Sequence, residues 1–191
     1  MRMRQIASLA ILTFGFSALV AAAPVPRPSA DFVIVEPSGN EIPLSSLKGD
    51  VVVIEFLLVG CARCQRIAQT LSTLNSELGP RGFHPIGIAF DVGINGLALN
   101  SFAQRFKVNY PVGYSTSDRV DSYLGRAITE RFQVPQIVVI DRAGVIRAQS
   151  RPVGEASLED ETYLRNLLDA LLKEAAPAGK AGEAMSTPTN G

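Results

Sequence analysis

The feature that most constrains the fold is a nearly unbroken apolar run at residues 51–59, VVVIEFLLV. The run is rich in β-branched residues and is short for a helix, so it predicts a strand that is covered on both faces. Such a strand needs a packing layer above its sheet and another below it. The run therefore favours a layered α/β fold.

The segments around this run alternate between helical and strand patterns. After a short alternating stretch and turn at 31–50, the predicted elements are the strand at 51–59, a helix at 61–78 stopped by Gly79-Pro80, a buried strand at 84–90, an amphipathic helix at 97–107, a short strand or loop at 110–115, a short helix at 117–125, a hairpin at 136–149 and a closing helix at 159–174. This order predicts one α/β domain with a mixed sheet.

Each predicted helix carries an apolar stripe that should face the sheet. The inward residues are Cys64, Ile67, Ala68, Leu71, Leu74 and Leu78 in the first helix, Leu97, Phe102 and Phe106 in the second, and Tyr163, Leu164, Leu167, Leu168 and Leu171 in the last.

The two ends of the chain differ in composition from the middle. Residues 1–4 are Met-Arg-Met-Arg, and residues 6–23 are apolar or small and carry no charge. We therefore expect a signal peptide or membrane anchor at 1–23, a proline-rich linker at 24–30, the folded domain at 31–174 and a disordered tail at 175–191. The chain would then be exported, either into the periplasm or tethered to the outer face of the inner membrane, where disulfides persist.

The charge balance gives no sign of a nucleic-acid partner, because the formal net charge is zero. Arg105 and Lys107 lie among aromatic residues in FAQRFKVNY. We interpret this segment as an amphipathic helix with a solvated face, so we expect no nucleic acid. We expect contact with a membrane only through the N-terminal segment.

The segment EFLLVGCARC, residues 55–64, contains both cysteines of the chain. Two cysteines and one histidine, His84, are too few for a closed four-ligand zinc site unless carboxylates complete it. A disulfide between Cys61 and Cys64 would also be a poor staple, because it closes a loop of two intervening residues. A redox-active pair explains the spacing better than a metal site or a structural disulfide.

The predicted position of the pair gives each cysteine a different role. Cys61 lies at the start of the helix, where unpaired N–H groups, the helix dipole and nearby Arg63 favour a thiolate. Cys64 lies one turn further on and should be more buried. We therefore expect Cys61 to attack a substrate disulfide and Cys64 to resolve the mixed disulfide.

Glu55 is an acid inside the apolar run, where burial of its charged form is costly. Desolvation should raise its pKa. Glu55 could then exchange a proton with Cys64, directly or through water. The alternative is that its side chain reaches the surface or pairs with an arginine.

Three segments resemble one family: residues 32–64, KVNYPVGYS at 107–115 and FQVPQIVVIDRAGVIRAQ at 132–149. They resemble the TlpA-like, ResA-like branch of exported thioredoxins, within the AhpC/TSA and Redoxin superfamily. The resemblance implies a thioredoxin-like fold with an N-terminal β-hairpin and an inserted strand-helix element. It implies a thiol–disulfide oxidoreductase that acts on proteins without cofactor or metal.

The resemblance also implies roles for residues. Cys61 matches the nucleophile, Cys64 the resolving thiol, and Glu55 the buried acid. Pro135 matches a cis-proline beside the Cys61–Cys64 disulfide, which leaves the Val134 backbone to pair with an extended substrate. Gly60 stands where the family usually has tryptophan, and Ala62-Arg63 separates the cysteines, so the direction of electron flow stays open.

The resemblance further suggests partners. A reductase would need an upstream dithiol electron donor, and its client could belong to cytochrome c maturation. We expect a monomer.

Two other classes share this fold. Peroxiredoxins resemble the segments YPVGYSTSD and VPQIVVIDRAG, but they need Thr or Ser three residues before the reactive cysteine, where this chain has Leu58. A copper-delivery module of the Sco type expects three residues between the cysteines and a late histidine. This chain has two residues there, and His84 comes too early.

Overall fold

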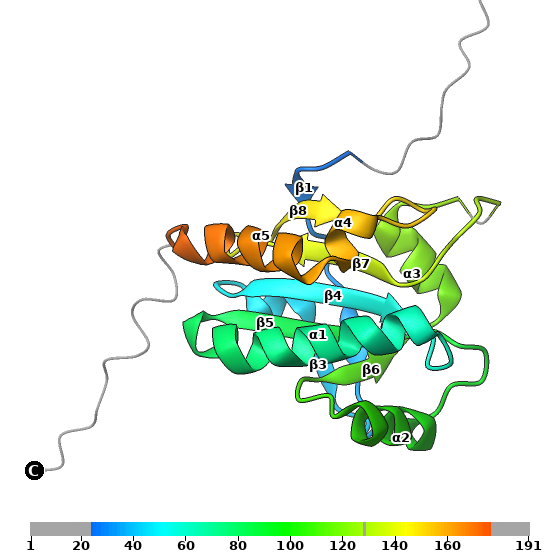
Figure 1. Ribbon diagram of the computed structural model, residues 1–191. Coiled ribbons are helices and arrows are strands. Elements are labelled where there is room, and N and C mark those ends of the chain that lie inside the picture. Colours follow the sequence, from blue (N-terminus) through cyan, green and yellow to red (C-terminus); the bar gives the residue numbers. More distant parts are fainter. Residues whose placement is uncertain (1–23, 128, 177–191) are drawn as a thin grey trace, which may run out of the picture.

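The computed structural model describes residues 24–127 and 129–176, which form a mixed sheet with helices on both faces (Figure 1). Its strands are β1 (Arg27–Pro28), β2 (Val33–Val35), β3 (Glu41–Pro43), β4 (Val51–Leu57), β5 (Phe83–Ala89), β6 (Val112–Tyr114), β7 (Gln136–Ile140) and β8 (Val145–Gln149). They lie in the order β1-β8-β7-β4-β5-β6-β2-β3. Strands β4, β5 and β6 are parallel, and the other neighbours pair antiparallel.

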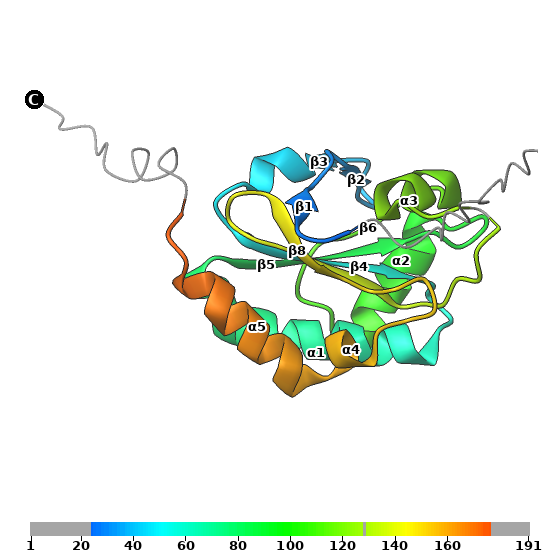
Figure 2. The ribbon, with the colours of Figure 1, turned by 90° about the horizontal axis from the view of Figure 1, so that it is seen from above.

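The helices cover this sheet unequally. They are α1 (Ala62–Leu78), α2 (Gly96–Phe106), α3 (Ser117–Leu124), α4 (Ala156–Glu159) and α5 (Glu161–Lys173), with 3-10 turns η1 (Leu44–Leu47) and η2 (Gly79–Arg81). Figure 2 shows α1, α4 and α5 on one face of the sheet and α3 on the other. The predicted α/β domain with a mixed sheet is confirmed.

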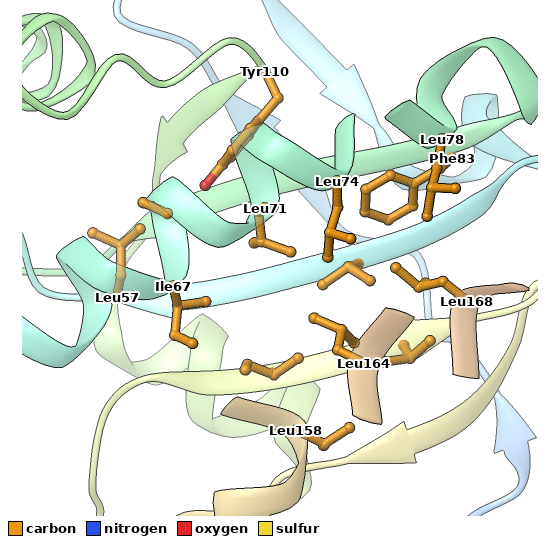
Figure 3. Close-up of a cluster of buried hydrophobic side chains, with 14 of the residues drawn as sticks. Leu57, Ile67, Leu71, Leu74, Leu78, Phe83, Tyr110, Leu158, Leu164 and Leu168 are labelled. Carbon is orange, nitrogen blue, oxygen red and sulfur yellow. The ribbon is translucent and has the colours of Figure 1, made fainter. Parts of the chain in front are cut away.

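The central strand β4 is buried along its whole length, as the apolar run predicted. Because successive side chains alternate between faces, Val51, Val53 and Leu57 join the core under α1 and α5. Figure 3 shows Leu57 in this core, with leucines of α1 and α5. The intervening residues, such as Phe56, join a second core under α3. Burial of each large apolar side chain contributes about 1.5–3 kcal/mol, so an apolar layer on each face holds β4 in place.

The predicted stripe of α1 is confirmed, since all six of its residues are buried. For two residues in other helices, the prediction that they face the sheet is wrong. Leu97 is 77% exposed, and the core of α2 is instead formed by Leu99 and Phe102. Leu97 lies five residues before Phe102, which is about 140° away around a helix. Tyr163 is likewise exposed, because the buried face of α5 runs through Leu164 and Leu168.

The N-terminal boundary also needs correction. Part of the expected linker at 24–30 is β1, which pairs with β8, so the sheet begins before residue 31. The expected signal peptide or anchor at 1–23 and nearly all of the expected tail lie outside the described residues. Within 24–127 and 129–176, no helix combines the length and hydrophobicity that a membrane span requires.

Two additions to the central α/β unit match the family resemblance. Strands β2 and β3 form the expected N-terminal hairpin, and this hairpin joins the sheet through β6. The expected inserted element consists of α2 and β6, which lie between β5 and α3. The insertion extends the sheet beyond β5 and brings the segment before β6 close to α1, as two hydrogen bonds from Asn75 of α1 to Asn109 show.

Candidate active site

The two cysteines lie at the N-terminus of α1, just after the turn that connects it to β4. Cys61 is the N-cap of α1, and its sulfur accepts a hydrogen bond from the Cys64 backbone N–H at 3.3 Å. The Cys61 backbone N–H donates to Leu58 O at 3.0 Å and closes the turn. A backbone N–H that points at the sulfur stabilises negative charge there. The predicted position of Cys61 at the helix start is therefore confirmed.

The turn that carries Cys61 is fixed by side chains from two other elements. Gln65 of α1 donates to Val59 O at 2.9 Å, and Asp91, just after β5, accepts from Val59 N at 3.1 Å. Gly60 is exposed, and a Cβ at this position would meet no atom within 4 Å. The turn is therefore held rigidly while the approach to it over Gly60 is open.

The cysteines differ in burial as the sequence predicted. Both are thiols, with Cys61 partly exposed and Cys64 buried. Burial raises the pKa of the Cys64 thiol well above its usual value, and the interaction with Cys61 raises it further. Cys61 is therefore the accessible sulfur, and Cys64 holds its proton more tightly than an exposed cysteine does.

The segment before β7 reaches the same site from the other side. The Val134–Pro135 peptide bond is cis, as the resemblance implied. The Cys61 thiol donates to the Val134 carbonyl oxygen at 3.9 Å, although the two residues are 73 positions apart in the chain. The fold thus brings together the predicted residues Cys61, Cys64, Val134 and Pro135.

Glu55 is completely buried, and it lies on the face of β4 that carries α1. Among the described residues, neither of its carboxylate oxygens has a hydrogen-bond partner. Burial raises the pKa of Glu55 well above its ordinary value, and negative charge on Cys61 and Glu159 raises it further. The expected pKa shift is confirmed, and the alternatives of an exposed or arginine-paired Glu55 are wrong.

Arg63, between the cysteines, has a partner that sequence reasoning missed. Its Nε donates to Glu159 of α4 at 3.0 Å, and its Nη2 forms an ion pair with the same carboxylate. Its Nη1 donates to Gln133 at 3.4 Å, next to Val134. Glu159 is separated from Arg63 by 96 residues, so no local pattern could have revealed the pair. The charge of Arg63 is therefore shared between Cys61 and an acidic partner.

The arrangement of possible metal ligands also bears on the site. No group of three or more His, Cys, Asp and Glu in that part of the chain is arranged to hold a metal ion. His84 lies in β5, away from the segment that carries the cysteines.

Comparisons with known proteins agree with this arrangement. The model of the AhpC/TSA family matches residues 25–149. Two curated relatives, both thiol-disulfide oxidoreductases ResA, come from Bacillus subtilis and Geobacillus kaustophilus. They are 28% identical to this chain over 94 and 90 residues, which is 49% and 47% of this chain and 51% of each relative. The chain thus spans about half the length of the curated relatives it matches.

Solved structures support the fold. A putative protein disulfide isomerase from Bacteroides thetaiotaomicron has a TM-score of 0.64 and 26% identity, with 81% of this chain and 93% of that chain covered. A thiol:disulfide interchange protein of the thioredoxin family from Chlorobium tepidum has a TM-score of 0.65 and 21% identity, with 79% and 99% covered. Because the identity to the second structure is 21%, that similarity is evidence for the thioredoxin-like fold alone.

Proposed function

Because this chain belongs to the AhpC/TSA family, we propose that it is a thiol–disulfide oxidoreductase that exchanges disulfides with protein substrates through Cys61 and Cys64. The observation that carries the proposal is the position of the Cys61 sulfur. It lies at the start of α1, between the Cys64 N–H and the Val134 carbonyl oxygen. The ResA relatives, which are named as thiol-disulfide oxidoreductases, support the same activity.

The reaction proceeds in two exchanges. The Cys61 thiolate attacks one sulfur of a substrate disulfide, a new S–S bond forms, and the other substrate sulfur leaves as a thiolate. Cys64 then attacks the Cys61 sulfur and releases the second substrate sulfur. The proton of Cys64 passes to the Glu55 carboxylate. Two electrons have then moved from the protein to the substrate, and Cys61 and Cys64 form a disulfide.

The substrate polypeptide lies in extended form beside Cys61. Its backbone pairs with Val134 at the cis-proline, Pro135, in the manner of a strand added to an edge. Gly60 leaves the other approach open to bulky partners, since no side chain covers it. Arg63 lies at the rim and contacts the substrate while it is held by Glu159.

The favoured direction is reduction of the substrate, outside the cytosol. The apolar segment at 6–23 supports export to the periplasm or to the outer face of the inner membrane. In that compartment a reductase requires an upstream dithiol donor to reduce the Cys61–Cys64 disulfide again. Cytochrome c maturation is the proposed process, and the protein acts as a monomer.

The first experiment measures the reduction potential of the Cys61–Cys64 couple against glutathione or dithiothreitol. A value near about −270 mV identifies a reductant, whereas a value near about −120 mV identifies a disulfide donor and contradicts the favoured direction. Cys64→Ser should trap a mixed disulfide on Cys61, and Cys61→Ser should trap none. A pair that does not cycle reversibly would overturn the proposed activity.

A further inference from the structure

Three buried oxygen atoms lie in the layer between α1 and the sheet without a hydrogen-bond partner among the described residues. Two belong to Glu55, and the third is the hydroxyl oxygen of Tyr110. A buried polar atom that is left unpaired loses its hydrogen bonds to water without replacement, so native structures contain few of them. Their occurrence in one core suggests that they serve one another.

The sheet register brings these two side chains together. Glu55 of β4 is paired with Gly87 of β5, and Gly87 is paired with Val112 of β6. Tyr110 lies two residues before Val112 and belongs to the same core. Figure 3 shows the Tyr110 ring reaching in between α1 and the sheet, with its hydroxyl directed to the side of Leu57. Leu57 lies two residues after Glu55 and on the same face of β4.

The segment that carries Tyr110 is anchored to α1. Asn109 donates to Ser72 O at 3.1 Å and to the Ser76 hydroxyl at 2.9 Å. On the other side, Pro111 O accepts from the Gly87 N–H at 3.0 Å. The Tyr110 ring is therefore fixed from both neighbours in the chain, and its hydroxyl is held inside the layer.

We propose that Tyr110 is a positioning residue for Glu55, and that its hydroxyl dipole stabilises the ionised Glu55 carboxylate, so that this carboxylate can accept the proton of Cys64. This inference rests on the proposed role of Glu55 in the exchange reaction.

The other groups around Glu55 oppose its ionisation. Cys61 and Cys64 approach from α1 and Glu159 from α4, and each carries or acquires negative charge. Arg63, the cation between the two cysteines, is paired with Glu159. Strands β5 and β7 present Gly87 and Ile137 beside Glu55. Tyr110, whose own pKa is raised by burial and by Glu55, instead brings a neutral hydroxyl into the same buried layer.

The test is an NMR titration of the Glu55 side-chain carboxyl carbon in the reduced full-length chain, assigned by its loss in Glu55→Gln. Tyr110→Phe should raise the titration midpoint by about one pH unit, a tenfold change in proton affinity. The matched control is Tyr123→Phe, because the Tyr123 hydroxyl bonds to Ser29 on the opposite face of the sheet. Tyr123→Phe should leave the midpoint unchanged.

A second measurement needs no variant of Tyr110. In the wild-type chain, the Tyr110 ring carbon that bears the hydroxyl should show an inflection at the Glu55 midpoint, and Glu55→Gln should abolish it. An unchanged midpoint in Tyr110→Phe, or no inflection at Tyr110, would overturn the inference.

The catalytic role of Glu55 is tested separately by the pH dependence of glutathione release from a Cys61 mixed disulfide. If Glu55→Gln leaves that dependence unaltered, the proton-acceptor role fails. The titration still decides whether Tyr110 is linked to Glu55.

Discussion

Glu55 is an acid that the fold keeps in an apolar layer, where its neutral form is favoured. Its pKa in the folded protein is raised well above the ordinary value of 4.5. Between these two values the folded protein holds a proton that the unfolded chain has already lost. Stability therefore falls as the pH rises through this window, by up to about 1.4 kcal/mol per pH unit. A protein retains such a residue at a cost in stability, which fits a role in proton transfer.

The corresponding prediction concerns Glu55→Gln in the reduced protein. This variant should be as stable as the wild type at about pH 4.5 and more stable by at least about 1 kcal/mol at about pH 8, because an amide cannot ionise. Urea unfolding at the two pH values measures the difference. The exposed strand residue Glu41 provides a control as Glu41→Gln. Equal stabilities of Glu55→Gln and wild type at both pH values would contradict the buried ionisation.

At the scale of elements, the start of α1 is tied to α4 by one ion pair. Arg63 and Glu159 are 40% and 16% exposed, so solvent screens their attraction in part. The pair still joins the inter-cysteine dipeptide to a short helix that packs beside α5, and through Gln133 to the segment before the cis-proline. It therefore orients the two segments between which the Cys61 sulfur lies.

A double-mutant cycle of Arg63→Gln and Glu159→Gln should give a coupling energy of about 0.5–1 kcal/mol in urea unfolding, the upper range for a partly exposed pair. The pair Arg151–Glu155 is the control, because Arg151 is 68% exposed and the two residues are neighbours in the chain. Its coupling should stay below about 0.5 kcal/mol. A coupling at Arg63–Glu159 no larger than this control would show that the pair does not join α1 to α4.

At the scale of the whole molecule, the N-terminal segment closes one edge of the sheet. Arg27 of β1 donates to the Gln149 side chain at 2.8 Å and to Tyr123 O at 3.3 Å. It thereby connects β1, β8 and α3. The family match also begins before residue 31, at residue 25. Arg27 and Pro28 are thus part of the sheet, although they precede residue 31.

Arg27→Ala should lower the free energy of unfolding by about 1–2 kcal/mol, because it removes two partly buried hydrogen bonds. Arg66→Ala, at an exposed position of α1, should change it by less than about 0.5 kcal/mol. Urea unfolding of both variants provides the comparison. If Arg27→Ala is as stable as Arg66→Ala, then β1 adds nothing to the domain, and a boundary at residue 31 would be restored.

Local sequence patterns were sufficient to predict the main helices and strands. The apolar run of β4, the stripe of α1 and the helix start at Cys61 all follow from periodicity and from capping chemistry. Errors arose where periodicity is weak. Leu97 lies in the first turn of its helix, and β1 is a two-residue strand in a proline-rich stretch. The helix α4, which carries Glu159, has four residues and is too short to show a helical periodicity.

The sequence by itself determined the spacing of Cys61 and Cys64, the burial of Glu55 and the layered α/β architecture, because each depends on residues that are close together in the chain. Only the tertiary structure decided which distant residues surround the cysteines. Val134 lies beside Cys61, Glu159 pairs with Arg63, and Tyr110 shares a core with Glu55. These contacts depend on the order and register of the strands, which long-range packing fixes and which short-range periodicity does not specify.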